Sequence, residues 1–173
     1  MRDYSSAENK IKRALGSVPE RFLLVDTSKQ RLSVIESGAL VKEYPVSTSK
    51  FGTGNNEGSF KTPRGVHRVR EKYGHGAPAG RVFRDRLDTG EDWPVGAPGG
   101  NVILSRILRL EGCEEGVNRG SGIDSYERYI YIHGTNNEAA VGSPASHGCV
   151  CMKNSDVIDL FDIVPEGTVV LID

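Results

Sequence analysis

The tetrapeptide Ser146-His147-Gly148-Cys149 places a nucleophile, a candidate base and a glycine next to one another. The cysteine supplies a thiolate, the reactive form of a nucleophilic cysteine. The glycine allows close approach of the backbone to a ligand. The N–H groups of Gly148 and Cys149 are suited to stabilising an oxyanion. The tetrapeptide therefore predicts covalent cysteine catalysis.

A thiol of ordinary pKa, near 8.5, is mostly protonated at neutral pH and needs a base. His147 lies two residues before Cys149, on the same side of an extended segment. His133 lies sixteen residues before Cys149, at the end of an apolar run. Spacing does not choose between these histidines, and either is compatible with a structural role. For His67 and His75 the surroundings favour a structural role.

A metal site is the alternative for the same residues. His133, His147, Cys149 and Cys151 are all ligand types that zinc accepts. However, one residue separates the two cysteines, whereas structural zinc sites usually separate them by about two to four. A Cys149–Cys151 disulfide would be strained. Three cysteines in all argue against a disulfide scaffold. We therefore expect no metal and at least one free thiol.

Composition restricts the partners of the chain. Its 173 residues suffice for one domain with its own core, and its formal net charge is -1. This charge provides no field that would attract nucleic acid, and no apolar run reaches the length of about 20 residues that spans a membrane. Residues 1–20 contain no apolar signal-peptide core. We expect a cytoplasmic protein or one whose leader has been removed.

The elements that must position these residues are mainly β. Residues 1–20 predict a helical appendage, with a helix over 4–15 that stops at Gly16, and residues 21–173 predict the catalytic domain. Short apolar runs separated by turns predict an antiparallel meander. The other expected strands follow the glycine-rich loop, carry His133 near their end, follow Cys149, or close the chain. The expected strands are 22–28, 31–37, 39–49, 66–70, 126–135, 150–152 and 168–172.

Three segments are less regular. Residues 50–65 predict a glycine-rich loop, and residues 71–100 predict a long irregular insertion that closes over the site as a lid. Residues 101–110 fit a strand or a short helix. Residues 154–164 predict a second helix with Asn154 or Ser155 as its N-cap. In total, we expect about seven strands and two short helices.

The motifs together resemble the L,D-transpeptidase catalytic domain of the YkuD type. IHGT at 132–135 is followed by SHGCVCM at 146–152, and TPRG begins at Thr62, about seventy residues before His133. The resemblance runs from about Phe22 to Ile172. It implies a β-sandwich-like fold with one or two short helices and no cofactor.

The resemblance also implies roles for the site residues. Cys149 becomes the nucleophile and His133 the general base, which a backbone group of Ser146 or Gly134 orients. The backbone of residues 147–149 would bind the oxyanion, while the His147 side chain would be mainly structural. Thr62 and Arg64 of TPRG are candidate substrate-binding residues.

One position departs from the family pattern. Members commonly carry an arginine two residues after the nucleophile, and this chain has Cys151 there. An arginine forms a bidentate clamp for a carboxylate, which a cysteine cannot replace. Substrate preference is therefore expected to differ. Five other arginines are candidates for the missing charge, namely Arg64, Arg68, Arg81, Arg106 and Arg119.

The implied reaction is acyl transfer on peptidoglycan stem peptides. A thioester on Cys149 would form with loss of a terminal D-alanine and then pass to an amine, giving a 3→3 cross-link. Such a cysteine would also react with carbapenems. The alternatives are an L,D-carboxypeptidase that hydrolyses the same bond, and a non-catalytic peptidoglycan-binding or zinc-stabilised module. The family implies the periplasm or cell envelope. The oligomeric state is not indicated.

Overall fold

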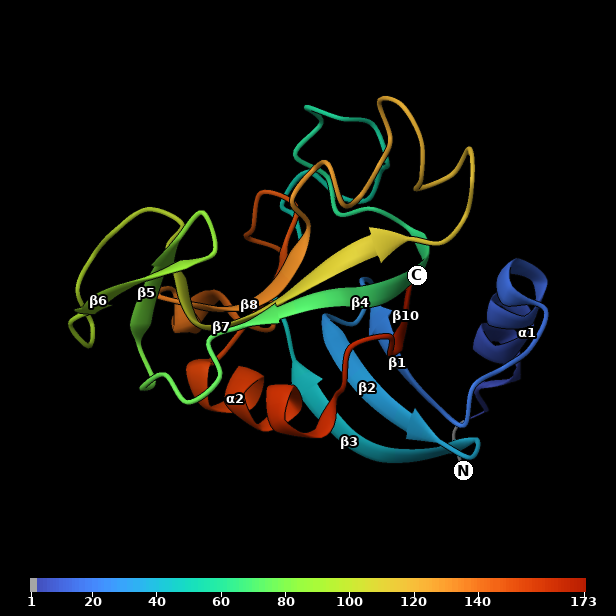
Figure 1. The fold of residues 1–173 in the computed structure, drawn as a ribbon, viewed down its shortest axis with the longest axis horizontal. Coiled ribbons are helices and arrows are strands. Elements are labelled where there is room, and N and C mark those ends of the chain that lie inside the picture. Colours follow the sequence, from blue (N-terminus) through green and yellow to red (C-terminus); the bar gives the residue numbers. More distant parts are fainter. Residues whose placement is uncertain (1–2) are drawn as a thin grey trace.

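A computed structural model describes residues 3–173. Helix α1 (Ser5–Leu15) ends at Gly16, which adopts a left-handed conformation and donates its N–H to Lys12. The predicted first helix and its stop are confirmed. Ala7 and Ile11 are buried in a cluster with Phe22 of the first strand. The helix therefore packs on the domain, at the opposite end from the hairpin of strands β5 (Arg81–Arg84) and β6 (Leu87–Asp92) (Figure 1).

Residues 3–173 are mainly β, as predicted, with ten strands where about seven were expected and with the two expected α-helices. The strands are β1 (Arg21–Asp26), β2 (Arg31–Glu36), β3 (Ala39–Pro45), β4 (Gly65–Tyr73), β5 (Arg81–Arg84), β6 (Leu87–Asp92), β7 (Ile103–Gly112), β8 (Tyr131–Thr135), β9 (Val150–Met152) and β10 (Val169–Ile172).

One curved sheet contains all of these strands. Its main path is β3-β2-β1-β10-β4-β7-β5-β6, and β8 pairs with both β7 and β9. The meander of the first three strands is confirmed by antiparallel pairing of β2 with β1 and β3. Beyond β3, Ser47 exchanges two backbone hydrogen bonds with Cys151, at 2.8 and 2.9 Å. The first sheet edge is thereby connected to the strand after the tetrapeptide.

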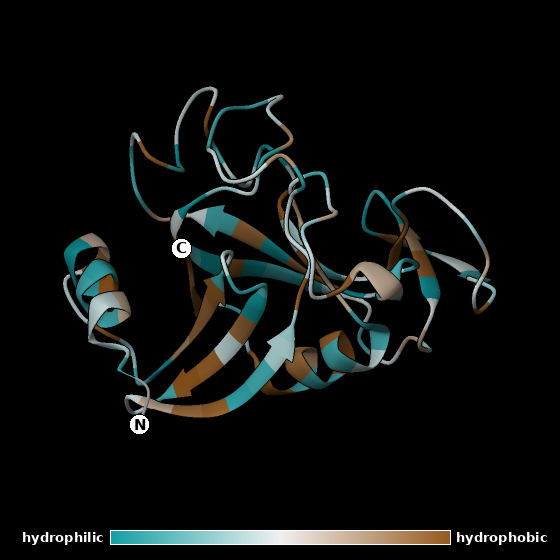
Figure 2. Cartoon of the chain, turned by 180° about the vertical axis from the view of Figure 1, so that it is seen from behind, coloured by the Kyte–Doolittle hydropathy of each residue, from teal (hydrophilic) through white to brown (hydrophobic). Residues whose placement is uncertain are grey.

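The main core lies between the sheet and helix α2 (Asn154–Ile163). Leu160 and Phe161 of α2 pack with residues such as Leu23, Leu108 and Ile132 of the strands. Figure 2 shows hydrophobic residues concentrated on the strands and hydrophilic residues in the loops. Within residues 3–173, no helix has the length and apolar character needed to cross a membrane.

Two local predictions need correction, and one open alternative is resolved. Residues 71–100 are not irregular throughout, because β5 and β6 form an antiparallel hairpin there. The segment that was ambiguous between strand and helix is strand β7. Neither Asn154 nor Ser155 is the N-cap of α2. Lys153 holds that position without a side-chain cap, and the Glu138 carboxylate accepts from the Asn154 N–H at 2.7 Å instead.

Candidate active site

Of the two predicted catalytic residues, His133 lies on β8, and Cys149 directly precedes β9, the parallel neighbour of β8. In the β8–β9 register, Ile132 pairs with Val150 and His133 with Cys151. Because side chains alternate along a strand, His133 and Cys151 share one face of the sheet. Cys149 lies just before β9, close enough for its charge to act on Cys151. Ile132 and Val150 point the other way, into the main core. The sheet therefore brings one imidazole and two thiols together.

His133 is fully buried and held in one orientation. Its Nδ1 lies 2.7 Å from the carbonyl oxygen of Gly134. Since a carbonyl only accepts, Nδ1 carries the proton, and the neutral ring presents an unprotonated Nε2. Burial lowers the pKa of His133 to about 4, opposed by the Gly134 hydrogen bond. Nε2 is therefore ready to accept a proton at neutral pH.

The sulfur that contacts this nitrogen belongs to Cys151. Cys151 Sγ lies 3.6 Å from His133 Nε2, and its side chain is 4% exposed. Burial raises the pKa of Cys151. The thiol at the position of the family's arginine is thus the resting partner of the imidazole.

Cys149 is partly exposed and has different contacts. Its sulfur accepts the Tyr131 N–H at 3.4 Å and donates to the Tyr129 carbonyl at 3.6 Å. Burial of the sulfur raises the pKa of Cys149 to about 11, opposed by the Tyr131 N–H and by the charge of Arg128. The thiol is therefore protonated at rest.

The tetrapeptide forms a tight turn around the Ser146 hydroxyl. Ser146 Oγ donates to the Cys149 carbonyl at 2.6 Å and accepts the Gly148 N–H at 3.2 Å. Gly148 has a φ of +130°, which a side chain would strain. Because its N–H is already engaged, an oxyanion role for Gly148 requires this bond to open.

Thr62 of TPRG supports the same turn. Its buried hydroxyl donates to the Gly148 carbonyl and accepts the Ser49 N–H, each at 2.9 Å. Thr62 therefore positions the tetrapeptide from the glycine-rich loop. Arg64, two residues later, is exposed and extends to Asp173, 3.4 Å away. The structure does not bring Arg64 to the thiols.

His147 is exposed, and its ring packs against two aromatic rings outside the thiol cluster. The ring centroids of Phe51 and Phe60 are 5.9 and 6.2 Å from that of His147. Within residues 3–173, no group of three or more histidine, cysteine or acidic side chains is arranged to hold a metal ion. All three cysteines are free.

Gly134 allows β8 to lie close to its neighbours. A Cβ atom at this position would lie 2.5 Å from the Leu104 carbonyl oxygen and 2.5 Å from Asn154 Oδ1. The side chain of Asn154 in turn donates to the Thr135 carbonyl at 3.0 Å. The glycine after His133 is therefore required for packing as well as for its carbonyl.

Two arginines that sequence reasoning did not select act on Cys149 or contact its neighbours. Arg128 donates to three carbonyls of the glycine-rich loop, including that of Lys61 at 2.6 Å, and its charge acts on Cys149. Arg86, in the β5–β6 turn, donates to the Tyr131 hydroxyl at 3.1 Å. No motif marks either residue, because both reach the site through tertiary contacts.

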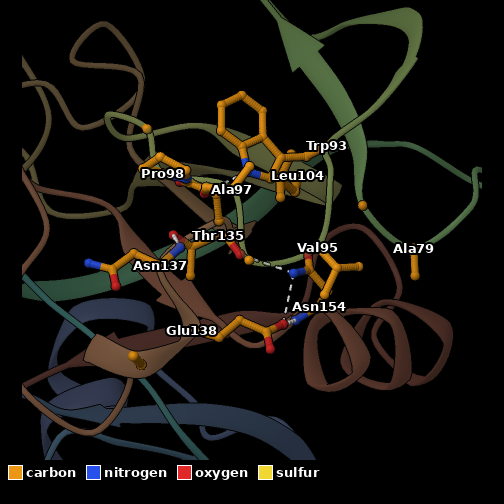
Figure 3. Close-up of a pocket in the computed structure, with 15 residues that line it drawn as sticks. Ala79, Trp93, Val95, Ala97, Pro98, Leu104, Thr135, Asn137, Glu138 and Asn154 are labelled. Atoms are coloured by element: carbon orange, nitrogen blue, oxygen red, sulfur yellow. Dashed lines mark hydrogen bonds between the residues drawn. The ribbon is translucent and has the colours of Figure 1, made fainter.

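Two cavities open beside the cluster. The smaller, about 220 Å³, is lined by Ser146, His147 and Cys151. The larger, about 720 Å³, lies between residues 93–99 and the end of β8. Figure 3 shows Trp93 above this space and Glu138 and Asn154 below it. Both cavities contact Gly99, Thr135 and Asn137, so they adjoin at the Cys151 side of His133.

Comparison with known proteins identifies the family of the chain. The L,D-transpeptidase catalytic domain family (YkuD) matches residues 20–172. The chain belongs to this family. YkuD of Bacillus licheniformis, named as an L,D-transpeptidase, is 54% identical over 152 residues, which cover 88% of this chain and 64% of the relative. YbiS of Escherichia coli K12 is 49% identical over 159 residues, with 88% and 47% coverage.

Solved structures share the fold at lower identity. L,D-transpeptidase 3 from Mycobacterium tuberculosis, in complex with a faropenem-derived adduct, matches with a TM-score of 0.56 and 18% identity, over 90% of this chain and 61% of that chain. The L,D-transpeptidase from Mycobacterium smegmatis matches with a TM-score of 0.56 and 20% identity, over 89% of this chain and 58% of that chain. The chain therefore spans less than two thirds of the length of these relatives.

Proposed function

We propose that the chain transfers acyl groups between peptidoglycan stem peptides through a thioester on Cys149. The observation that carries this proposal is a partly exposed thiol one residue before the strand that pairs with β8, where a neutral histidine presents an unprotonated Nε2. Membership in the L,D-transpeptidase family supplies the substrate class. Because peptidoglycan lies outside the membrane, the proposed location is the periplasm or cell envelope.

In the first half-reaction, Cys149 attacks the carbonyl that precedes a terminal D-alanine. His133 Nε2 takes the thiol proton, the sulfur–carbon bond forms, and the N–H of Cys149 stabilises the oxyanion. The carbon–nitrogen bond then breaks, and D-alanine leaves with the proton from His133. At rest the imidazole contacts the sulfur of Cys151, so the reaction requires Cys149 to approach Nε2 when substrate binds, as catalytic hydrogen bonds commonly tighten only then.

In the second half-reaction, an amine of a neighbouring diaminopimelate attacks the thioester. His133 takes the amine proton and returns it to the Cys149 sulfur as the new amide forms, which gives the 3→3 cross-link. The N–H of Cys149 again faces the oxyanion, with the carbonyl of the same residue held by Ser146. Every proton transfer in the cycle uses His133.

Incubation with a stem tetrapeptide tests the proposal. We expect mass spectrometry to detect an acyl-enzyme, a cross-linked dimer and free D-alanine, and Cys149→Ala to give none of them. Tripeptide and D-alanine without dimer would instead identify an L,D-carboxypeptidase. If the wild-type chain forms no acyl-enzyme and binds the peptide unchanged, the protein is a binding module and the proposed catalysis is wrong.

A further inference from the structure

Arg86 lies against the two tyrosines whose backbones contact the sulfur of Cys149. It lies in the turn between β5 and β6, where Asp85 and Arg86 both have positive φ, of 48° and 69°. Its Nη1 donates to the Tyr131 hydroxyl at 3.1 Å, and its Cζ lies 5.3 Å from the centroid of the Tyr129 ring. Two aromatic side chains thus hold the guanidinium in place.

The same two tyrosines contact the sulfur of Cys149 through their backbones. The Tyr131 N–H donates to Sγ, and Sγ donates to the Tyr129 carbonyl. Tyr131 is 5% exposed, and both it and Cys149 pack in the cluster around Phe83 and Ile107. The guanidinium of Arg86 is therefore separated from the reacting sulfur by the length of one fixed tyrosine side chain.

The charge of Arg86 is not neutralised by the protein. On the same hairpin, Arg81 pairs with Asp88 and Asp92, at 3.1 and 2.6 Å, and Arg84 pairs with Glu91 at 3.9 Å. Among the described residues, no carboxylate lies within 4.0 Å of Arg86. A partly buried arginine fixed without an acidic partner is suited to bind an anion from outside the chain.

A second positive charge, that of Arg109, lies beside the same tyrosine ring. Arg109 Cζ lies 4.9 Å from the centroid of the Tyr129 ring. Arg109 forms an ion pair with Glu71, 3.4 Å away. Of the two arginines beside Tyr129, Arg86 is therefore the one that can pair with a carboxylate of a ligand. Tyr129 is 52% exposed, and the aromatic surface between the two cations is therefore accessible.

We infer that Arg86 binds a carboxylate of the stem peptide beside the bond that Cys149 attacks. This inference rests on the proposed function. Two extended residues span about 7 Å, which is comparable with the length of the tyrosine side chain that separates the guanidinium from the sulfur, so the carboxylate we place at Arg86 is about two residues' length from the attacked carbonyl. Arg86 thereby supplies, from the β5–β6 hairpin, the cationic clamp that Cys151 cannot provide.

Kinetics with charge-matched peptides test the inference. The probes are a tetrapeptide with free carboxylates and two versions with one carboxylate as an amide, at the terminal D-alanine or at the diaminopimelate side chain. Arg86→Gln is compared with Arg84→Gln, a control on the same hairpin. We expect Arg86→Gln to lower kcat/KM for the free-acid peptide about 10- to 100-fold, mainly through KM.

The amide peptide that lacks the bound carboxylate identifies the contact, because wild type and Arg86→Gln should process it at similar rates. Arg86→Lys keeps the charge without the bidentate fork. Its kcat/KM for the free-acid peptide should lie between those of wild type and Arg86→Gln. Equal losses on all three peptides, or rates for Arg86→Gln equal to those of Arg84→Gln, would overturn the inference while leaving the proposed function intact. No acyl-enzyme from wild type with any peptide would overturn both.

Discussion

Thr62 provides a sharp test of how the glycine-rich loop positions the nucleophile. Thr62→Val keeps the shape of the side chain but removes the hydroxyl that serves the Ser49 N–H and the Gly148 carbonyl. Each buried backbone group left without a partner costs about 1–3 kcal/mol, so we expect a total loss of about 2–6 kcal/mol in unfolding free energy. Thr62→Ser retains both bonds and loses one methyl group, at about 0.8 kcal/mol.

Urea denaturation measures both variants, and acylation by a stem peptide or a carbapenem measures the effect on the site. In Thr62→Val the freed Gly148 carbonyl should let the tetrapeptide shift, and a displacement of about 1 Å costs about 100-fold in rate. Equal unfolding free energies for Thr62→Val and Thr62→Ser would refute the reasoning. So would a direct loss of peptide binding in Thr62→Ser, which would indicate that the residue contacts substrate.

Three further outcomes follow from the site. Gly134→Ala should lower the unfolding free energy by about 1–3 kcal/mol and slow acylation, because its Cβ would meet a backbone oxygen; unchanged acylation would contradict this. Since the pKa of Cys149 is raised to about 11, its alkylation, followed by peptide mass spectrometry, should accelerate about tenfold per pH unit from pH 7 to 9. A plateau below pH 8 would instead indicate a thiolate–imidazolium pair. Arg128→Met should slow alkylation at pH 8, because the charge that lowers the Cys149 pKa is removed; an unchanged rate would exclude this electrostatic role.

Much of the fold was predictable because its signals are local. The first meander, strand β8 and helix α2 follow from short apolar runs between turns and from one helical periodicity. The β5–β6 hairpin was missed because its turn uses Asp85 and Arg86 with positive φ, instead of the glycine or asparagine typical of such turns. Asn154 was misassigned as a cap because its side chain accepts a hydrogen bond from the Ser105 hydroxyl and donates one to the Thr135 carbonyl.

The site was predictable in its residue types but not in its contacts. The motif selects Cys149 and His133, yet only the strand register shows that Cys151 is the residue paired with His133. Arg64 follows Thr62 in a motif, but its side chain extends to the chain's last residue, Asp173. Arg86 carries no sequence signal, since its place depends on contacts with tyrosines far along the chain. Long-range packing decides which charged residues reach a site.

The most direct test of the account is which sulfur becomes acylated. Intact and peptide mass spectrometry of wild type, Cys149→Ala and Cys151→Ala after exposure to a carbapenem decides this in one experiment. We predict one adduct on wild type and on Cys151→Ala, located at Cys149, and none on Cys149→Ala. An adduct on Cys149→Ala that disappears in Cys151→Ala would show that the thiol in contact with His133 is the nucleophile, and would contradict the account.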